Sequence, residues 1–440
     1  MLFRSETLAT LPTVRGLISD FTRLTPQNSG TNSFGGADNR MNNMTVNGAA
    51  FNNSFGLGGQ PGDRTGVAPI SMEAIEQVQV SIAPYDISQG NFVGASVDTV
   101  TRSGTNSLRA AGYYRFRNDG FVGTEARGNV FNPGTFDTKQ TGVWAGAPIV
   151  KNRLFAFGNF ENEKDARPLN TFRANSGGEA VGGNVTRVLA SDASALSAFL
   201  KSSFGYDTGS IDPQTKNTPQ KRGIVRGDFN LNNANKISFN YVQLNSSTDV
   251  QLSGSTSAGI GRRQVATDAL NYANSNYQIL ENRKTSAGEW NSVLGTTMSN
   301  SLRVTYSYSD ESRPQSSTLF PFVDILQGGT AYLSFGSEPF TPNNELRYKS
   351  FEAKNDFVKF GNKHELKIGG RIERYHSDNV FFNCCKQGAW VYNSLDDFYA
   401  DAREALANPN RAASSITARN YQVRYMNLDR KSTRLNSSHT

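Results

Sequence analysis

Polar and apolar residues alternate with a period of two along much of residues 107–428, and no other feature constrains the fold of this 440-residue chain so strongly. In one segment the apolar and aromatic positions are Leu302, Val304, Tyr306 and Tyr308. In another they are Leu366, Ile368, Gly370 and Ile372. A period of two places successive side chains on opposite faces of a β-strand. The chain is therefore predicted to be mainly β, although alternation alone leaves a soluble β-sandwich open.

The lengths of the connections separate these two classes of β-protein. About ten strands are expected, near 107–118, 137–147, 153–164, 220–231, 235–246, 282–297, 301–314, 348–360, 364–380 and 415–428. The connections at 148–152, 232–234, 298–300 and 361–363 are short, whereas those at 119–136, 165–219, 247–281, 315–347 and 381–414 are long. Short and long connections alternate, as in outer-membrane barrels with short periplasmic turns and longer external loops. The sequence thus predicts a membrane-spanning antiparallel β-barrel, with residues 107–428 forming its first strands.

Composition excludes several other classes of protein. The sequence holds no run of eighteen apolar residues, which excludes a membrane-spanning helix. The net charge is +7, but Lys and Arg alternate with acids and form no basic stripe, so no nucleic-acid partner is expected. Lumen-facing arginines and contacts with anionic lipopolysaccharide explain the charge more simply. The two cysteines, Cys384 and Cys385, are adjacent, which leaves open a strained disulfide, two free thiols or pairing with a third cysteine.

No motif indicates catalysis or a bound cofactor. His364 and His376 fall in an expected barrel hairpin, and neither accompanies a nucleophile signature such as GxSxG. The glycines of GLGGQPG, residues 56–62, precede no helix and are interpreted as a flexible loop rather than a nucleotide-binding motif. We therefore expect that the chain is not an enzyme, and we expect no cofactor and no metal site.

One helix is expected inside a long loop. The segment SLDDFYADAREAL, residues 394–406, begins with the capping residue Ser394. Its apolar stripe consists of Leu395, Phe398, Tyr399, Ala402 and Leu406. We favour packing of this helix over the mouth of the barrel, and the alternative is contact with a surface lipoprotein.

Residues 1–106 differ from the rest of the chain. They are richer in Gly and Asn, lack long alternating strands and contain a short capped turn at Ser71. This fits a small α/β body inside a wide barrel, because barrels of about 22 strands are the ones with a plugged lumen. Candidate substrate contacts at the apex of this plug are Asn39, Arg40, Asn42, Asn43 and Asn47. Asn amides suit polar cargo because they donate and accept hydrogen bonds, but the composition favours the alternative that these residues stabilise turns.

Several segments resemble the TonB-dependent outer-membrane receptors, most closely their Oar-like branch. Within residues 75–118 the run VDTVTRSGTN, residues 97–106, is the most specific part of the resemblance. AGAPIVKNRLFAFGNFENEK, residues 145–164, is similar to the second and third barrel strands of that family, and FGNKHELKIGGRIERY, residues 360–375, to a mid-barrel hairpin. One departure is Ala147, where the family more often has glycine.

The resemblance implies a plug domain at 1–106 and a barrel in the cell outer membrane of a Gram-negative bacterium. It implies capture of an unidentified substrate and import driven by the TonB–ExbB–ExbD complex. Outer-membrane lipid surrounds such a barrel, and a surface lipoprotein is a further candidate partner. The alternatives are an Oar-like surface protein with a structural, adhesion or secretion role, and a secreted soluble β-protein.

Both ends of the sequence carry expectations of their own. Residues 429–439 read DRKSTRLNSSH, which is similar to an in-frame translation of a sequencing adapter. We expect residues 429–440 to be non-biological. We also expect the chain to be a fragment, with an incomplete plug and a truncated barrel, without a signal peptide, a TonB box or the C-terminal barrel strands.

Overall fold

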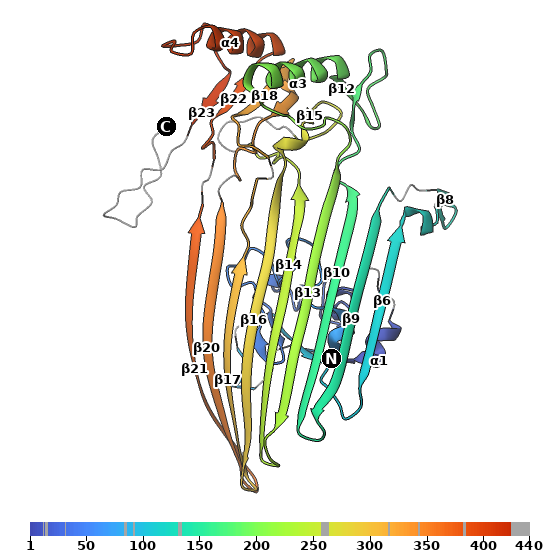
Figure 1. Ribbon diagram of the computed structural model, residues 1–440, viewed down its shortest axis with the longest axis vertical. Coiled ribbons are helices and arrows are strands. Elements are labelled where there is room, and N and C mark those ends of the chain that lie inside the picture. The colour runs from blue at the N-terminus through green and yellow to red at the C-terminus, as the bar shows by residue number, and fades with distance from the viewer. Residues whose placement is uncertain are drawn as a thin grey trace.

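The computed structural model describes residues 1–11, 13, 16–30, 32–82, 86–90, 93–130, 134–256, 264–315, 317–341, 344–381 and 384–423. The chain is mainly β, and it forms a tall curved wall, a small body behind that wall and a cap above one end of it (Figure 1).

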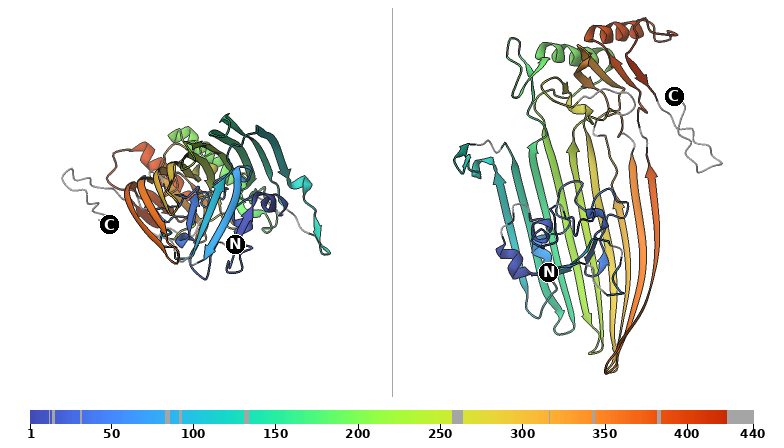
Figure 2. Two further views of the ribbon diagram at one scale, coloured as in Figure 1. Left: turned by 90° about the horizontal axis from the view of Figure 1, so that it is seen from below. Right: turned by 180° about the vertical axis from the view of Figure 1, so that it is seen from behind.

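The wall is a nine-stranded antiparallel sheet in which each strand pairs with the wall strands that precede and follow it in the sequence. Its strands are β6 (Arg109–Asn118), β9 (Asp137–Val150), β10 (Leu154–Pro168), β13 (Thr215–Asn230), β14 (Asn235–Val250), β16 (Tyr277–Leu294), β17 (Met298–Asp310), β20 (Glu345–Phe360) and β21 (Glu365–Val380). The predicted fold class and nine of the predicted strands are confirmed. Because β6 and β21 lie at opposite edges of the sheet, the barrel is not closed within the described residues (Figure 2).

The tenth predicted strand, 415–428, is wrong over the residues that the structure describes. Only Asn420–Gln422 form a strand there, β23, and it pairs with β22 (Ala389–Tyr392) in the cap. Tyr421 lies against Trp390, with ring centroids 4.9 Å apart. This aromatic contact places β23 in the cap sheet rather than next to β21. Residues 424–428 lie outside the described part of the chain.

The small body, which we call the plug, comprises the described residues up to Thr101. Its sheet has the order β1-β4-β5-β2-β3. The elements are β1 (Leu2–Arg4), α1 (Ser5–Thr10), α2 (Ser19–Thr22), η1 (Asn39–Met41), β2 (Asn43–Val46), β3 (Ala49–Ala50), η2 (Met72–Ala74), β4 (Ile75–Ile82) and β5 (Ala95–Thr101). Its apolar core includes Phe21, Phe51 and Ile75 and continues onto Phe157 and Ile224 of the wall. The plug therefore packs on one face of the wall, which we call the inner face (Figure 2).

The cap forms from the long loops, in which the sequence predicted one helix and no strands. Five strands from three separate segments of the chain pair in the order β15-β19-β18-β22-β23. The cap contains β11 (Arg173–Asn175), β12 (Val185–Leu189), α3 (Ala190–Phe204), β15 (Leu270–Asn271), η5 (Ala273–Ser275), β18 (Phe322–Gln327), β19 (Thr330–Phe335), β22 and α4 (Leu395–Ala407). Apolar residues of α3, α4 and the sheet form one buried cluster. A separate loop carries η3 (Asp119–Phe121), β7 (Glu125–Ala126) and β8 (Asn129–Val130).

The predicted local features of the cap and plug are present. The Ser394 hydroxyl caps α4 by accepting a hydrogen bond from the Asp397 amide at 3.1 Å, and Phe398 packs into the cap core. The Ser71 hydroxyl likewise accepts a hydrogen bond from the Glu73 amide at 3.3 Å. Cys384 and Cys385 are buried and joined by a disulfide, one of the three states left open by the sequence.

None of the helices in the described ranges is both long enough and apolar enough to cross a membrane.

Candidate functional site

The inner face of the wall holds the plug through side chains that donate to plug backbone carbonyls. The donor atoms lie 2.6–2.9 Å from their acceptors in five contacts: Arg222 to Ala68, Arg226 to Thr101, Arg283 to Asn52, Arg303 to Gly48, and Lys354 to Ser88. These cations belong to four strands, β13, β16, β17 and β20, and each occupies a polar position of the period-two pattern. A backbone carbonyl accepts a hydrogen bond whatever the side chain of its residue. These contacts therefore depend on the path of the plug backbone and not on the identity of the plug residues.

Carboxylates of the wall accompany most of these cations. Arg226 pairs with Asp228 at 2.8 Å, Arg303 with Glu289 at 2.9 Å and Lys354 with Asp356 at 3.0 Å. Arg222 contacts both Glu161 and Glu163. A charge removed from water is costly unless it is paired, so the carboxylates allow the cations to reach the plug without leaving an uncompensated charge.

Arg283 is held in a different way. Its side chain is buried, its guanidinium donates to the carbonyl of Asn52, and the group lies 4.8 Å from the ring centroid of Phe51. A cation over an aromatic face is stabilised by the ring quadrupole. The Phe51 ring therefore supplies part of the stabilisation that carboxylates give to the other cations.

Two buried carboxylates of the wall, Glu281 and Glu311, hold the plug segment 53–66. Glu281 accepts hydrogen bonds from the amides of Arg64 and Thr65 at 3.1 and 3.3 Å. Glu311 accepts from the side chains of Asn53 and Arg64 at 3.2 and 3.1 Å. Glu281 lies near the start of β16 and Glu311 directly follows β17, so this contact is at the cap end of the wall.

The glycine-rich run 56–62 lies in this held segment, as a series of turns. Gly62 has a φ of +96°, and a Cβ atom there would lie 2.3 Å from the carbonyl oxygen of Val67. Only glycine fits this backbone position. The sequence predicted a loop here, and the structure adds that its path depends on close backbone approach.

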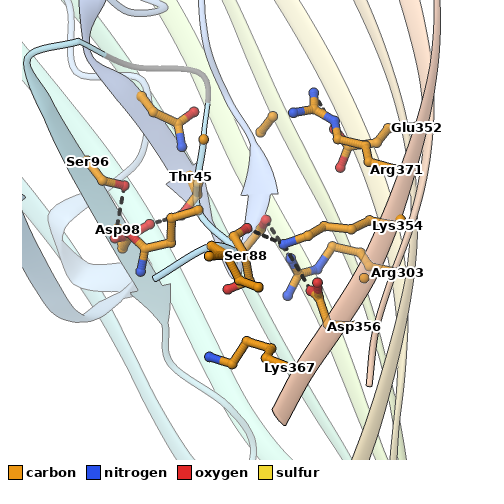
Figure 3. A pocket seen from close by; sticks show the side chains of 18 residues that line it. Thr45, Ser88, Ser96, Asp98, Arg303, Glu352, Lys354, Asp356, Lys367 and Arg371 are labelled. Carbon is orange, nitrogen blue, oxygen red and sulfur yellow. Dashed lines mark hydrogen bonds and ion pairs between the residues drawn. The ribbon is translucent and has the colours of Figure 1, made fainter. Parts of the chain in front are cut away.

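A cavity of about 450 Å³ separates the plug from β17, β20 and β21. Figure 3 shows Lys354 and Lys367 extending from the wall toward the plug, while Thr45 and Ser96 donate to Asp98 on the plug side. Lys367 reaches Asp86 at 3.1 Å. Hydrogen bonds from Ser88 and the contact with Lys367 lower the pKa of Asp86 to about 2. The cavity is thus lined by fixed charges of both signs and suits a polar occupant.

The five predicted substrate contacts do not lie together. Asn39 and Asn42 line one small cavity, Asn43 lines the cavity of Figure 3, and Asn47 lines a third cavity beside Arg226, near the short-turn end of β13. The plug segment that reaches the cap end is 53–66, so Asn47 is not at the apex.

The amides of three of these residues are used within the plug. Asn42 accepts from the Ala95 amide at 3.0 Å, Asn43 accepts from the Asn52 side chain at 2.7 Å, and Asn47 accepts from the Thr101 amide at 2.9 Å. Arg40 pairs with Asp38 at 2.8 Å, and this hydrogen bond lowers the pKa of Asp38 to about 2. These contacts stabilise local structure, and cargo contact by the five residues stays a prediction.

His364 and His376 lie in the hairpin formed by β20 and β21, as the sequence predicts. The carbonyl of His364 closes the turn by accepting from the Gly361 amide at 2.7 Å, and His376 lies 3.1 Å from Asp378 on the surface. No cluster of three or more His, Cys, Asp or Glu residues is found in these ranges.

The sequence predicted lumen-facing arginines, but not that these cations and the carboxylates beside them hold the plug. Their signal is charge at the polar positions of strands whose other positions are apolar, as at Arg283 and Arg303. The side chains on that face were recognised as polar, but the partner surface that they contact was not identified.

Residues 100–426 match the family model described as outer membrane beta barrel domain. The chain belongs to this family. The wall is therefore part of an outer-membrane β-barrel, and the predicted location in the bacterial outer membrane is confirmed.

The relatives agree with the resemblance found in the sequence. The TonB-dependent transporter Oar of Myxococcus xanthus is 25% identical over 162 residues, which cover 34% of this chain and 14% of Oar. The fold is similar to that of the outer-membrane transporter YddB of Escherichia coli, with a TM-score of 0.60 and 12% identity, over 89% of this chain and 50% of YddB. A mutant of the ferric enterobactin receptor PfeA of Pseudomonas aeruginosa gives a TM-score of 0.52 at 11% identity, over 86% and 49%. The chain spans about half the length of these solved proteins.

Proposed function

We propose that this outer-membrane barrel and its plug belong to a TonB-dependent transporter that binds a substrate at the outer surface and imports it. The observation that carries the proposal is the way the plug is held on the inner face of the wall. Side-chain donors on four wall strands bind plug carbonyls, and Glu281 and Glu311 bind the segment 53–66. A body fixed by such contacts blocks the lumen at rest.

The same contacts allow the plug to move. A hydrogen bond that involves a charged group contributes only about 1.5–3 kcal/mol net, because water replaces the lost partner. A mechanical pull that admits water along this interface can therefore shift the plug without unfolding the wall. The proposal assigns this work to the TonB–ExbB–ExbD complex and no catalytic step to the chain itself.

Uptake by cells tests the proposal with the full-length protein that contains this chain. Cells with the gene, without it, and with the gene but without TonB are grown on a panel of ferric siderophores, oligosaccharides and peptides. Depletion of each compound from the medium is measured by mass spectrometry. We expect at least one compound to be taken up only when both the gene and TonB are present.

Unchanged depletion of every compound after deletion of the gene contradicts import. That outcome, together with a defect in adhesion or secretion, favours the Oar-like surface role. Uptake that requires the gene but not TonB contradicts the energy source alone. A plasmid copy of the gene is the control, since it must restore the lost uptake.

A further inference from the structure

The outer face of the wall carries a group of cations that the plug does not use. The pairing of β16, β17, β20 and β21 sets Lys284 opposite Tyr308, Tyr308 opposite Lys349, and Lys349 opposite His376. Arg374 lies two residues from His376 and on the same face of β21. Neighbouring strands are about 4.8 Å apart, so Lys284 and Lys349 flank Tyr308 at roughly 10 Å from each other.

The register shows that these side chains face away from the plug. Arg283, the neighbour of Lys284, donates to the plug carbonyl of Asn52, and Tyr348, the neighbour of Lys349, hydrogen-bonds Glu311 on the inner face. Successive side chains of a strand point to opposite faces. Lys284, Lys349 and Arg374 are exposed, as this alternation requires.

These three cations have no carboxylate partner within 4.0 Å among the residues that the structure describes. The acids nearest in register are already paired, since Asp310 and Glu345 contact Arg347, and Asp378 contacts His376. Charges on the inner face are treated differently, because Arg226, Arg303 and Lys354 each have a carboxylate. The outer group therefore presents positive charge to its surroundings.

The height of the group along the wall identifies those surroundings. Below it the outer face is apolar and exposed, at Val304, Tyr306, Phe351, Ile368 and Ile372. Lys359, ten positions from Lys349 on β20, ends this band on the short-turn side. Ten residues span roughly 33 Å along a strand, and a tilt of about 40° reduces this to roughly 25 Å along the membrane normal, the height of the apolar band of an outer-membrane barrel. The group thus lies at the headgroup level of the outer leaflet.

We propose that Lys284, Lys349 and Arg374, with Tyr308 between the lysines, bind the phosphate groups of an anionic glycolipid in the outer leaflet. Lysine and arginine donate to phosphate oxygens as charge-assisted hydrogen bonds. Flexible lysine side chains on both sides of Tyr308 converge on one phosphate or bridge two. The inference rests on the outer-membrane location and is independent of import.

Binding of a purified lipid to the full-length protein in detergent tests the proposal. The probes are diphosphorylated lipid A and the same lipid after removal of both phosphates, with affinities measured by native mass spectrometry. We expect the dephosphorylated lipid to bind the wild-type protein at least tenfold more weakly. Equal binding of the two lipids overturns the proposal, and this measurement needs no variant.

A variant locates the site. Each cation near an anionic surface contributes roughly fivefold in affinity, so the triple variant Lys284→Gln, Lys349→Gln, Arg374→Gln is expected to lose roughly 100-fold for diphosphorylated lipid A. The matched control is Lys359→Gln, on the same strand and face but at the opposite boundary of the apolar band. Retention of heat-modifiable mobility on gels confirms that both barrels are folded. The assignment is overturned if Lys359→Gln loses as much affinity for diphosphorylated lipid A as the triple variant does. It is also overturned if the triple variant binds this lipid as tightly as the wild type.

Discussion

In the cap, Phe335 and Phe199 pack ring against ring with Phe398, at centroid distances of 5.3 and 6.2 Å. The wall holds the plug through an apolar contact at Phe157 and Ile224 and, in addition, through donors to backbone carbonyls. Apolar burial depends on exclusion of water, while a hydrogen bond to a carbonyl is readily exchanged for one to water. The cap is thus built to stay assembled, and the plug is built to be fixed in place yet able to shift. Substitutions in each region should separate these two kinds of attachment.

The largest expected effect comes from Arg222→Ala in the plug interface. The variant leaves Glu161, 1% exposed, as a buried charge without its cation. Removing one partner of a buried pair typically costs about 3–5 kcal/mol. In the full-length protein we expect the plug to become protease-sensitive at lower urea concentration. Lys139→Ala, which breaks an exposed pair with Asp137, is the control and should leave the midpoint unchanged.

Phe398→Ala tests the cap in the same way. The ring is 6% exposed and is central to the aromatic cluster, so its loss should destabilise the cap by about 3 kcal/mol, at the lower end for Phe→Ala substitutions. Proteolysis should then begin in cap loops while the plug remains protected. Equal increases in the proteolysis of the plug and of the cap would contradict the view that the two regions are held independently.

A smaller effect is expected from Ser394→Ala at the start of α4. The substitution removes the acceptor for the Asp397 amide and should cost about 1 kcal/mol. Hydrogen exchange of the first turn of α4 measures this loss. Ser394→Asp keeps an acceptor and should exchange like the wild type, and identical exchange in all three proteins would contradict a capping role.

The smallest effect is expected when the pH is lowered and Asp401 in the cap becomes protonated. Burial alone would raise the pKa of Asp401, but hydrogen bonds from Ser414, Tyr392 and Arg411 lower it below its ordinary value. A carboxyl whose folded-state pKa is depressed stabilises the fold above its unfolded pKa, about 3.9. This contribution is lost as pH falls below about 4. The protection factors of amides in residues 408–415, taken against the intrinsic exchange rate at each pH, should therefore fall between pH 5 and 3, and Asp401→Asn should remove most of that fall.

The wall could be predicted from the sequence because its signal is local. Each strand carries its own alternation, and the short turns limit how neighbouring strands pair, so nine strands were located within a few residues. The helix at 394–406 was predictable for the same reason, since both Ser394 and its apolar stripe lie within one segment.

The cap and the plug contacts could not be predicted because they join distant residues. Strand β18 pairs with β22, in which each partner residue lies 67 positions later, and each segment alone is too short to carry a clear pattern. Helix α3 begins at Ala190 without a side-chain cap. Arg283 donates to Asn52, 231 positions away, and neither residue by itself indicates the other. The alternation in residues 415–428 was wrongly interpreted as a tenth barrel strand. Only residues 420–422 form a strand there, and they pair with β22 in the cap.

Successive side chains of a wall strand alternate between the inner and outer faces, and this alternation limits the insertions and deletions that the strands of this family can tolerate. Arg283 binds the plug and Lys284 faces outward, so an insertion of one residue upstream in β16 would exchange their positions and reverse every later side chain of that strand. Strands should therefore accept only paired insertions or compensating bulges. In the external loops no such parity applies, and length differences between relatives should accumulate there.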